Sequence, residues 1–268
     1  MSIEHYENFP VASFLLPRHL RPAVETVYTF ARNADDFADE GDFTNEERIH
    51  KLNEYQHELD KIVRQEQSEQ GLFIRLRQHI QAFQIPLDCF YDLLSAFKQD
   101  INTTRYPSYA DLLNYCQRSA NPVGRIMLHL YKSIDAEKLR QSDAICSALQ
   151  IINFIQDVAI DWDKQRIYLP LEDLARFELS QDMQQARKQQ NWSPMMRFQC
   201  ERARALMLSG SQLSLNLPGR IGWELRLVVQ GGLRILEKIE ACNYDVFQQR
   251  PTITKMDAPL LCWRALCM

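Results

Sequence analysis

Apolar residues recur at three- and four-residue spacings along almost the whole chain of 268 residues. This is the period of one face of an α-helix, whereas a half-buried strand alternates every two residues. The chain has only 8 glycines and 11 prolines, and no Asn-Gly or Asp-Gly turn joins two apolar runs as in a hairpin. We therefore expect an all-α fold. Because no repeat, low-complexity tract or linker interrupts the pattern, we expect a single domain over residues 1–268.

The composition is that of an ordinary globular protein, with 46% hydrophobic and 25% charged residues. A net charge of −4 argues against a general affinity for nucleic acid, which depends on a basic surface. The 7 cysteines are scattered without a Cys-x-x-Cys pair, so we expect them to be reduced and not to bind zinc. Residues 1–7 lack signal-peptide features, and no apolar stretch approaches the roughly 18–20 residues of a membrane span, which predicts a cytoplasmic protein.

Local signals mark where helices begin and end. Thr44 and Glu47 have the spacing of a capping box, Ser108 precedes Asp111 as a helix cap, and Ser193 precedes a proline as expected for another cap. The expected helices run from Pro17–Pro22 to about 40, from 44 to about 67, from about 70 to 84 and 87 to 101, from 108 to a disturbance at Asn121-Pro122, from about 136 to 162, from 193 to about 215, and from 219 to about 248.

The first acidic stretch, residues 35–40, carries four carboxylates at the end of the first predicted helix. Tyr28, Arg32, Asp35 and Asp39 are spaced by four, three and four residues, so they share one helix face. Carboxylates at a helix C-terminus oppose the macrodipole and repel one another. The stretch is therefore either a solvated acidic helix end or a site for a bound cation.

The second acidic stretch is a stripe of Asn153, Asp157 and Asp161, each four residues apart, after the apolar run 148–152. A carboxylate in such a setting is rarely left unpaired, because burying a bare charge is costly. It is either paired with a neighbouring arginine or part of a metal site. Oxygen ligands without histidine or cysteine favour a hard cation, and Mg²⁺ is typical where phosphates complete its shell.

Basic residues accompany both stretches. Arg32 lies one turn from Asp35, and Lys164 and Arg166 follow Asp161. A guanidinium group matches phosphate oxygens bidentately. The sequence thus predicts a pocket in which the two stretches face each other and bind Mg²⁺ together with a diphosphate, whose departure metal and arginine assist.

Four motifs in this order extend the pattern: Tyr28-x-Phe30-x-Arg32-x-x-Asp35-Asp36-x-x-Asp39-Glu40, Tyr115-Cys116, Asn153-x-x-x-Asp157-x-x-x-Asp161 and Arg166-x-Tyr168-Leu169-Pro170. With them the chain resembles the head-to-head trans-prenyl transferases, that is, the squalene, dehydrosqualene and phytoene synthases, over about residues 8–250. Within this family, residues 8–13, 34–41, 119–125 and 156–162 resemble most closely the hydroxysqualene-forming branch of bacterial hopanoid biosynthesis. Squalene and phytoene synthases usually have Val-Ala-Gly-x-Val-Gly at 119–124 and often Arg at Gln156. Both departures touch the implied pocket, and Phe14 and Gln156 are expected to contact the substrate.

The resemblance implies an isoprenoid synthase fold, a helical bundle around a central cavity. It implies Mg²⁺ ligands at Asp35, Asp39, Asn153 and Asp157 supported by Asp36 and Asp161, diphosphate contacts at Arg32, Lys164, Arg166 and Tyr168, and a reacting end lined by Tyr28, Tyr115 and Tyr244. The implied reaction ionises presqualene diphosphate and captures the rearranged cation with water, giving hydroxysqualene and diphosphate. The implied partner is a presqualene diphosphate synthase that hands over the substrate.

Several readings stay open. Aromatic residues such as Phe14, Tyr28, Tyr115 and Phe154 either stabilise a carbocation through their π faces or only fill the core. Asn121 either orders the water that captures the cation or marks a helix kink. The tail, residues 259–268, is either a last packed helix or a membrane-surface contact. The alternative activities are a prenyltransferase that condenses two prenyl diphosphates, and a non-catalytic helical assembly partner.

Overall fold

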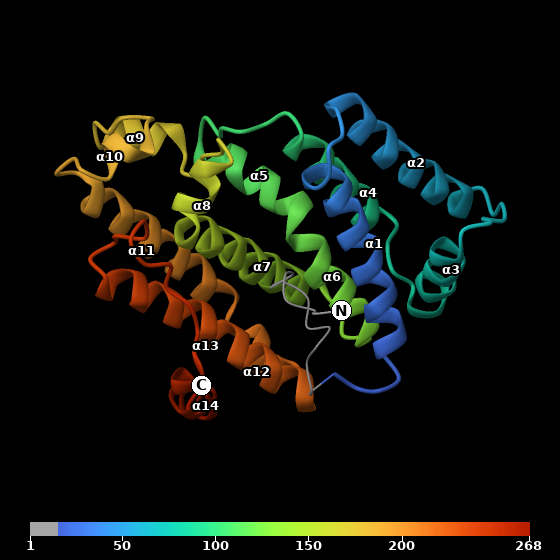
Figure 1. Ribbon diagram of the computed structural model, residues 1–268. Coiled ribbons are helices and arrows are strands. Elements are labelled where there is room, and N and C mark those ends of the chain that lie inside the picture. Colours follow the sequence, from blue (N-terminus) through green and yellow to red (C-terminus); the bar gives the residue numbers. More distant parts are fainter. Residues whose placement is uncertain (1–15) are drawn as a thin grey trace. The chain divides into compact units, whose positions relative to one another are not determined.

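The computed structural model describes residues 16–268, and Phe14 therefore lies outside the described residues (Figure 1). Within this range every regular element is a helix, and extended pairing is limited to an isolated parallel bridge between Arg105 and Ile167. The all-α prediction is confirmed. The elements are α1 (Arg21–Asp39), α2 (Asn45–Val63), α3 (Gly71–Phe83), α4 (Asp88–Asp100), α5 (Tyr109–Ser119), α6 (Asn121–Leu130), α7 (Ala136–Gln156), α8 (Val158–Asp163), α9 (Leu171–Arg176), α10 (Met183–Ala186), α11 (Trp192–Gly210), α12 (Leu213–Asn216), α13 (Gly219–Ala241), the 3₁₀ helix η2 (Lys255–Asp257) and α14 (Ala258–Leu266).

The chain forms two compact units. Unit 1 comprises the residues up to Thr103 together with Gln117–Leu139, and unit 2 comprises Thr104–Cys116 together with Arg140–Met268. The expectation of a single domain over residues 1–268 stays a prediction. None of the helices in residues 16–268 combines the length and the apolar character that crossing a bilayer requires.

Unit 1 is built around α1, which packs on α2, α3 and α4. The ring of Phe30 on α1 is fully buried and meets Phe73 and Phe90 edge to face, with ring centroids 6.0 and 5.3 Å apart. Edge-to-face contacts of this kind add about 0.5–1.5 kcal/mol per pair beyond the burial of area. They fix the rotation of α1, so that the half-buried Arg32 and Asp35 lie away from this aromatic core.

Unit 2 places α7 against α11 at very close range. A Cβ added to Gly210, the last residue of α11, would collide with the main-chain oxygen of Gln141 and lie 2.9 Å from Cγ1 of Ile145, both on α7. Further along, α13 packs on α11, α12 and α14 (Figure 1). The glycine contact fixes the position of the helix that carries Asn153 at its far end.

The predicted caps at the first two sites are confirmed. Thr44 accepts a hydrogen bond from the Glu47 amide while the Glu47 carboxylate accepts one from the Thr44 amide, which is a complete capping box. Ser108 and Asp111 exchange the same pair of bonds at the start of α5. The break at Asn121-Pro122 is confirmed as well, because α5 ends at Ser119 and α6 begins at Asn121.

Three predicted boundaries are wrong. Ser193 does not cap α11, which begins at Trp192, because its hydroxyl donates to the main-chain oxygen of Asn243 instead. The helix expected to reach residue 248 ends at Ala241, because Asn243 and Tyr244 adopt left-handed backbone angles with φ of 52° and 63°. The helix expected over 136–162 is interrupted at Asp157, where α7 gives way to the short α8.

Candidate functional site

The first acidic stretch contains its own counter-ion. The Arg32 guanidinium lies 2.8 Å from a carboxylate oxygen of Asp36, 2.7 Å from one of Glu40 and 3.6 Å from one of Asp35. All of these residues belong to the last three turns of α1 or follow it directly. Asp39, the last residue of α1, is exposed.

The charges of this cluster shift one another. Burial alone would lower the pKa of Arg32, but attraction to Asp36, Asp35 and Glu40 outweighs it, so that pKa is raised. Burial raises the pKa of Asp36, and the neighbouring Arg32 only partly offsets this effect. The cluster therefore keeps Arg32 charged and makes the Asp36 carboxylate easier to protonate than an exposed one.

Arg48, at a position in α2 whose local sequence pattern does not signal this role, adds a second positive charge at this end of α1. Its guanidinium donates to the main-chain oxygens of Phe37 at 3.1 Å, Glu40 at 3.0 Å and Gly41 at 2.8 Å. A cation at a helix C-terminus satisfies the last carbonyl groups and complements the macrodipole. The unfavourable helix end from which a bound cation was inferred is thus partly neutralised by two arginines of the chain itself.

The second acidic stretch keeps its stripe across the break between α7 and α8. The Asp157 amide donates to the Asn153 oxygen at 2.8 Å, and the Asp161 amide donates to the Asp157 oxygen at 2.9 Å. These bonds keep the four-residue helical spacing on both sides of the interruption. Asn153, Asp157 and Asp161 are all half-buried.

Arg250 holds the centre of this stripe. Its Nε lies 2.5 Å from Oδ1 of Asp157 and its Nη2 lies 3.0 Å from Oδ2, so the two groups form a bidentate ion pair. Next to it, the buried Gln156 side chain donates to the main-chain oxygen of Pro251. The pairing of Asp157 with an arginine, one of the two readings left open by the sequence, is present. That arginine is 93 positions away, and nothing in the local sequence around it signals the contact.

Four aromatic rings of unit 2 form a contiguous buried cluster. The rings of Phe154 and Tyr168 stack with centroids 3.8 Å apart and planes within 4° of parallel. Tyr115 lies 6.2 Å from each of them and 5.4 Å from Tyr106. The structure therefore brings together the predicted site residues Tyr115 and Tyr168. Phe154 of α7 contacts both of them.

The loop after α8 gathers the predicted basic residues. Asp161, Arg166 and Tyr168 line one narrow recess with Phe154, Val158, Ile167, Leu169 and Met183. Arg105, which sequence reasoning did not single out, braces the loop by donating to the Gln165 oxygen at 2.6 Å. Lys164, the residue after α8, is exposed.

The remaining predicted residues lie in several places. Tyr28 packs partly buried against the core of unit 1, and Asn121 is buried at the start of α6 in the same unit. Tyr244 belongs to unit 2, where its main-chain oxygen accepts a 3.1 Å hydrogen bond from the Trp192 indole. Arg32 and the first acidic stretch lie in unit 1, whereas the second stretch lies in unit 2, so the expectation that they face each other stays a prediction.

The donor chemistry fits Mg²⁺ better than a softer metal. Asn153, Asp157 and Asp161 offer oxygen atoms as ligands, which hard cations prefer. The Asp157 carboxylate already accepts hydrogen bonds from the Arg250 guanidinium through both of its oxygens. Between Leu16 and Met268, no group of three or more acidic, histidine or cysteine side chains lies close enough together to hold a metal by itself. The oxygen donors of either stretch therefore fit a metal whose shell is completed by other ligands, such as phosphate oxygens.

Comparison with known proteins decides the family. The model of the squalene/phytoene synthase family matches residues 3–257 of the chain. The chain belongs to the squalene/phytoene synthase family. This is a family of enzymes, and the prediction from the four motifs is confirmed at this level.

Individual members of the family resemble the chain to different extents. A hydroxysqualene synthase of Zymomonas mobilis is 36% identical over 193 residues, which cover 67% of this chain and 63% of that relative. A phytoene synthase of Arthrospira platensis is 26% identical over 273 residues, covering 96% of this chain and 88% of the relative. The crystal structure of the squalene synthase HpnC from Alicyclobacillus acidocaldarius superposes with a TM-score of 0.83, at 36% identity and 90% coverage of both chains. The predicted isoprenoid synthase fold is confirmed by this likeness.

Proposed function

We propose that this family member converts presqualene diphosphate and water to hydroxysqualene with release of diphosphate, a carbon–oxygen lyase reaction in squalene and hopanoid biosynthesis. One observation carries the proposal: the stripe of Asn153, Asp157 and Asp161 keeps its spacing and leads directly into a loop with Lys164 and Arg166. Carboxylate and amide oxygens suit Mg²⁺, and the positive charges beside them suit the oxygens of a diphosphate group. The likeness to curated hydroxysqualene synthases supports the choice of product.

The residues of the chain divide the work by their chemistry. Asn153, Asp157 and Asp161, with Asp35, Asp36 and Asp39 of the first stretch, would hold Mg²⁺, which would supply the charge that stabilises the leaving diphosphate. Arg32, Lys164 and Arg166 neutralise its outer oxygens. Tyr168 hydrogen bonds to it through its phenol while its ring stays stacked on Phe154. Fixed donors of this kind lower the barrier because they need no rearrangement as charge develops.

The aromatic cluster suits the organic part of the reaction. When the carbon–oxygen bond breaks, its electron pair leaves with the diphosphate and a cyclopropylcarbinyl cation remains. The faces of Tyr115 and Phe154 present electron density to such a cation and exclude water from it. Tyr28 and Tyr244 line the reacting end in this proposal. After rearrangement, one water adds its oxygen to the cation and loses a proton, which balances the reaction.

We assign the placement of this water to Asn121, with Arg125 as the alternative one turn later. Asn121 is 2% exposed at the start of α6, and its side-chain amide can both donate a hydrogen bond to a water molecule and accept one from it. Replacing it in Asn121→Gly is expected to divert the product from the alcohol. The alcohol formed unchanged at the full rate by this variant would contradict the assignment.

The competing activity is a head-to-head prenyltransferase, which the likeness to phytoene synthases favours. The protein is incubated with Mg²⁺ and either presqualene diphosphate or farnesyl diphosphate alone, and products are identified by mass spectrometry. We expect hydroxysqualene from presqualene diphosphate alone. Product from farnesyl diphosphate alone would establish the transferase, and no Mg²⁺-dependent diphosphate release from either substrate would leave only a non-catalytic role. Faster turnover with a presqualene diphosphate synthase in the same vessel would support direct hand-over.

We also propose a peripheral contact with an anionic lipid surface through α14. Leu261 and Ala265 face the protein, whereas Trp263 and Leu266 share the opposite face and are each 65% exposed. Exposed Lys255 lies just before this helix and supplies positive charge near the apolar face. Tryptophan and leucine beside basic residues are typical of helices that lie in the headgroup region of a membrane.

Vesicle sedimentation tests this contact. The protein should pellet with vesicles of phosphatidylcholine and phosphatidylglycerol more than with phosphatidylcholine alone, and the double variant Trp263→Ser/Leu266→Ser should lose most of this binding. Leu208→Ser on α11, which removes an apolar side chain that is 52% exposed, is the matched control and should bind as the wild type does. Equal binding by all three proteins would refute the contact, as would self-association through the same face in analytical ultracentrifugation.

A further inference from the structure

Residues 250–257, here called the strap, connect the second acidic stretch to the C-terminal helix. At its first end the strap is tied by the Arg250 ion pair with Asp157 and by the bond from Gln156 to the Pro251 oxygen. At its other end it is tied by Asp257. The strap is therefore fastened at two places that differ in chemistry.

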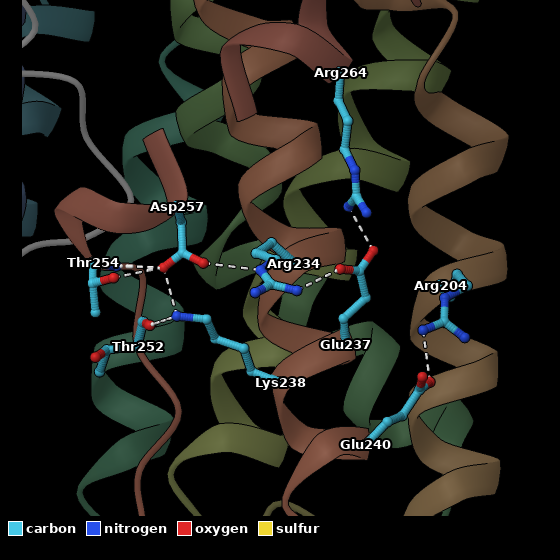
Figure 2. Close-up of polar contacts among 9 residues, drawn as sticks. All are labelled: Arg204, Arg234, Glu237, Lys238, Glu240, Thr252, Thr254, Asp257 and Arg264. Carbon is cyan, nitrogen blue, oxygen red and sulfur yellow. Dashed lines mark hydrogen bonds and ion pairs between the residues drawn. The ribbon is translucent and has the colours of Figure 1, made fainter. Parts of the chain in front are cut away.

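The far end is a dense ion-pair network on α13 (Figure 2). Asp257, which is 5% exposed as a side chain, accepts bonds from Arg234 at 2.9 Å and Lys238 at 2.5 Å. Its second oxygen also accepts from the amide and hydroxyl of Thr254 at 2.8 and 2.9 Å, and Lys238 reaches the Thr252 oxygen at 2.7 Å. Hydrogen bonds from Lys238, Thr254 and Arg234 hold the pKa of Asp257 well below its usual range. This end stays charged and attached at any ordinary pH.

The near end is held by the ion pair of Arg250 with Asp157 and by the hydrogen bond from Gln156 to the Pro251 oxygen. The Asp157 side chain is 22% exposed and that of Arg250 is 35% exposed, so water and ions can reach both. Arg250 donates to both oxygens of the Asp157 carboxylate. A divalent ion also needs an oxygen of this carboxylate in its inner shell. A guanidinium and a divalent cation at the same carboxylate repel each other strongly, because two positive charges only a few ångströms apart are poorly screened inside a protein.

We propose that Arg250 is a resident counter-ion of Asp157 that a divalent metal ion displaces, and that the first half of the strap moves with it while the Asp257 end stays fixed. The inference rests on the proposed metal site. Arg250 is then a positioning residue: it keeps the Asp157 carboxylate charged and oriented before metal arrives, and it sets how tightly the free protein binds metal. Loss of Arg250 removes the competitor, so metal should bind more tightly and not less.

Metal binding to the substrate-free protein tests the sign of this effect. Mn²⁺ binding is measured by electron paramagnetic resonance for the wild type, Arg250→Gln, Arg250→Lys and Lys255→Gln. We expect Arg250→Gln to bind Mn²⁺ about three- to tenfold more tightly than the wild type. Arg250→Lys keeps the positive charge but cannot form the bidentate pair, so its affinity should lie between those of the wild type and Arg250→Gln. Lys255→Gln removes one charge from the same strap at an exposed position and should leave the affinity within about twofold. Circular dichroism confirms that each variant is folded.

Hydrogen exchange supplies the second readout. Adding Mg²⁺ to the wild type should speed amide exchange in the first half of the strap, while the Thr254 and Asp257 amides keep their protection. In Asp157→Asn this response to Mg²⁺ should vanish. Unchanged or weaker Mn²⁺ affinity in folded Arg250→Gln would overturn the inference, and so would failure of every variant to bind Mn²⁺. Tighter binding in Arg250→Gln without any turnover of presqualene diphosphate would uphold the exchange and refute the proposed function.

Discussion

The contact of Gly210 with α7 gives a stability prediction that can be worked from distances. In Gly210→Ala the new Cβ meets the Gln141 main-chain oxygen, which cannot move without the helix, and Cγ1 of Ile145 at 2.9 Å. Because a main-chain atom cannot yield, we take the upper part of the usual cost of overpacking, about 2–3 kcal/mol. The better helix propensity of alanine returns at most about 1 kcal/mol. We expect a net loss of about 1–2 kcal/mol in the free energy of unfolding, or about 2–8 °C in the melting temperature.

Gly231→Ala is the matched control. Gly231 lies in the interior of α13, and a Cβ there would have no atom within 4 Å. This variant should gain about 0.5–1 kcal/mol, since glycine in a helix costs that much relative to alanine. Urea unfolding followed by circular dichroism at 222 nm measures both. A Gly210→Ala protein as stable as the wild type, next to a stabilised Gly231→Ala protein, would refute the close packing of α7 on α11.

Three further outcomes follow from local contacts. Thr44→Ala should lower the free energy of unfolding by about 1 kcal/mol in urea titrations, because it removes the capping hydrogen bond of α2. Burial and the hydrogen bond to Asp60 raise the pKa of Tyr91 to about 12, so the folded protein keeps this proton between pH 10 and 12 while the unfolded chain loses it. Wild-type stability should therefore fall across that window, and Tyr91→Phe should lose less, with absorbance at 295 nm reporting the phenolate. The exposed Cys262 and Cys267 should react first with a thiol reagent, and their replacement by serine should abolish the fast phase.

The fold was predictable wherever a local signal decides it. The capping boxes at Thr44 and Ser108 and the break before Pro122 depend on residues within four positions of one another, and all three are confirmed. One failure involves a distant partner, and another involves a local turn of the backbone. The Ser193 hydroxyl donates to the Asn243 oxygen and does not cap α11. The helix α13 ends early because Asn243 and Tyr244 adopt left-handed backbone angles. A sequence window contains no information about such contacts.

The candidate site shows the same division. The four-residue spacing of Asn153, Asp157 and Asp161 was visible in the sequence and persists through a helix break that was not foreseen. The charges that neutralise the acidic residues were not visible. Arg48 had the spacing of a surface residue, and Arg250 had no pattern at all, yet each meets a predicted acidic stretch directly.

The division of the chain between the two units has a consequence for truncated forms of the protein and for the order in which its contacts form during synthesis. The chain changes unit three times, since Thr104–Cys116 belongs to unit 2 and Gln117–Leu139 to unit 1. A truncation that retains the whole of one unit therefore also retains a segment of the other: residues 1–139 include Thr104–Cys116 of unit 2, and residues 104–268 include Gln117–Leu139 of unit 1. During synthesis on a ribosome, Tyr106 and Tyr115 emerge well before Phe154 and Tyr168, the rings they pack against. The aromatic cluster of unit 2 can therefore be completed only after α7 and the loop that follows α8 have been made.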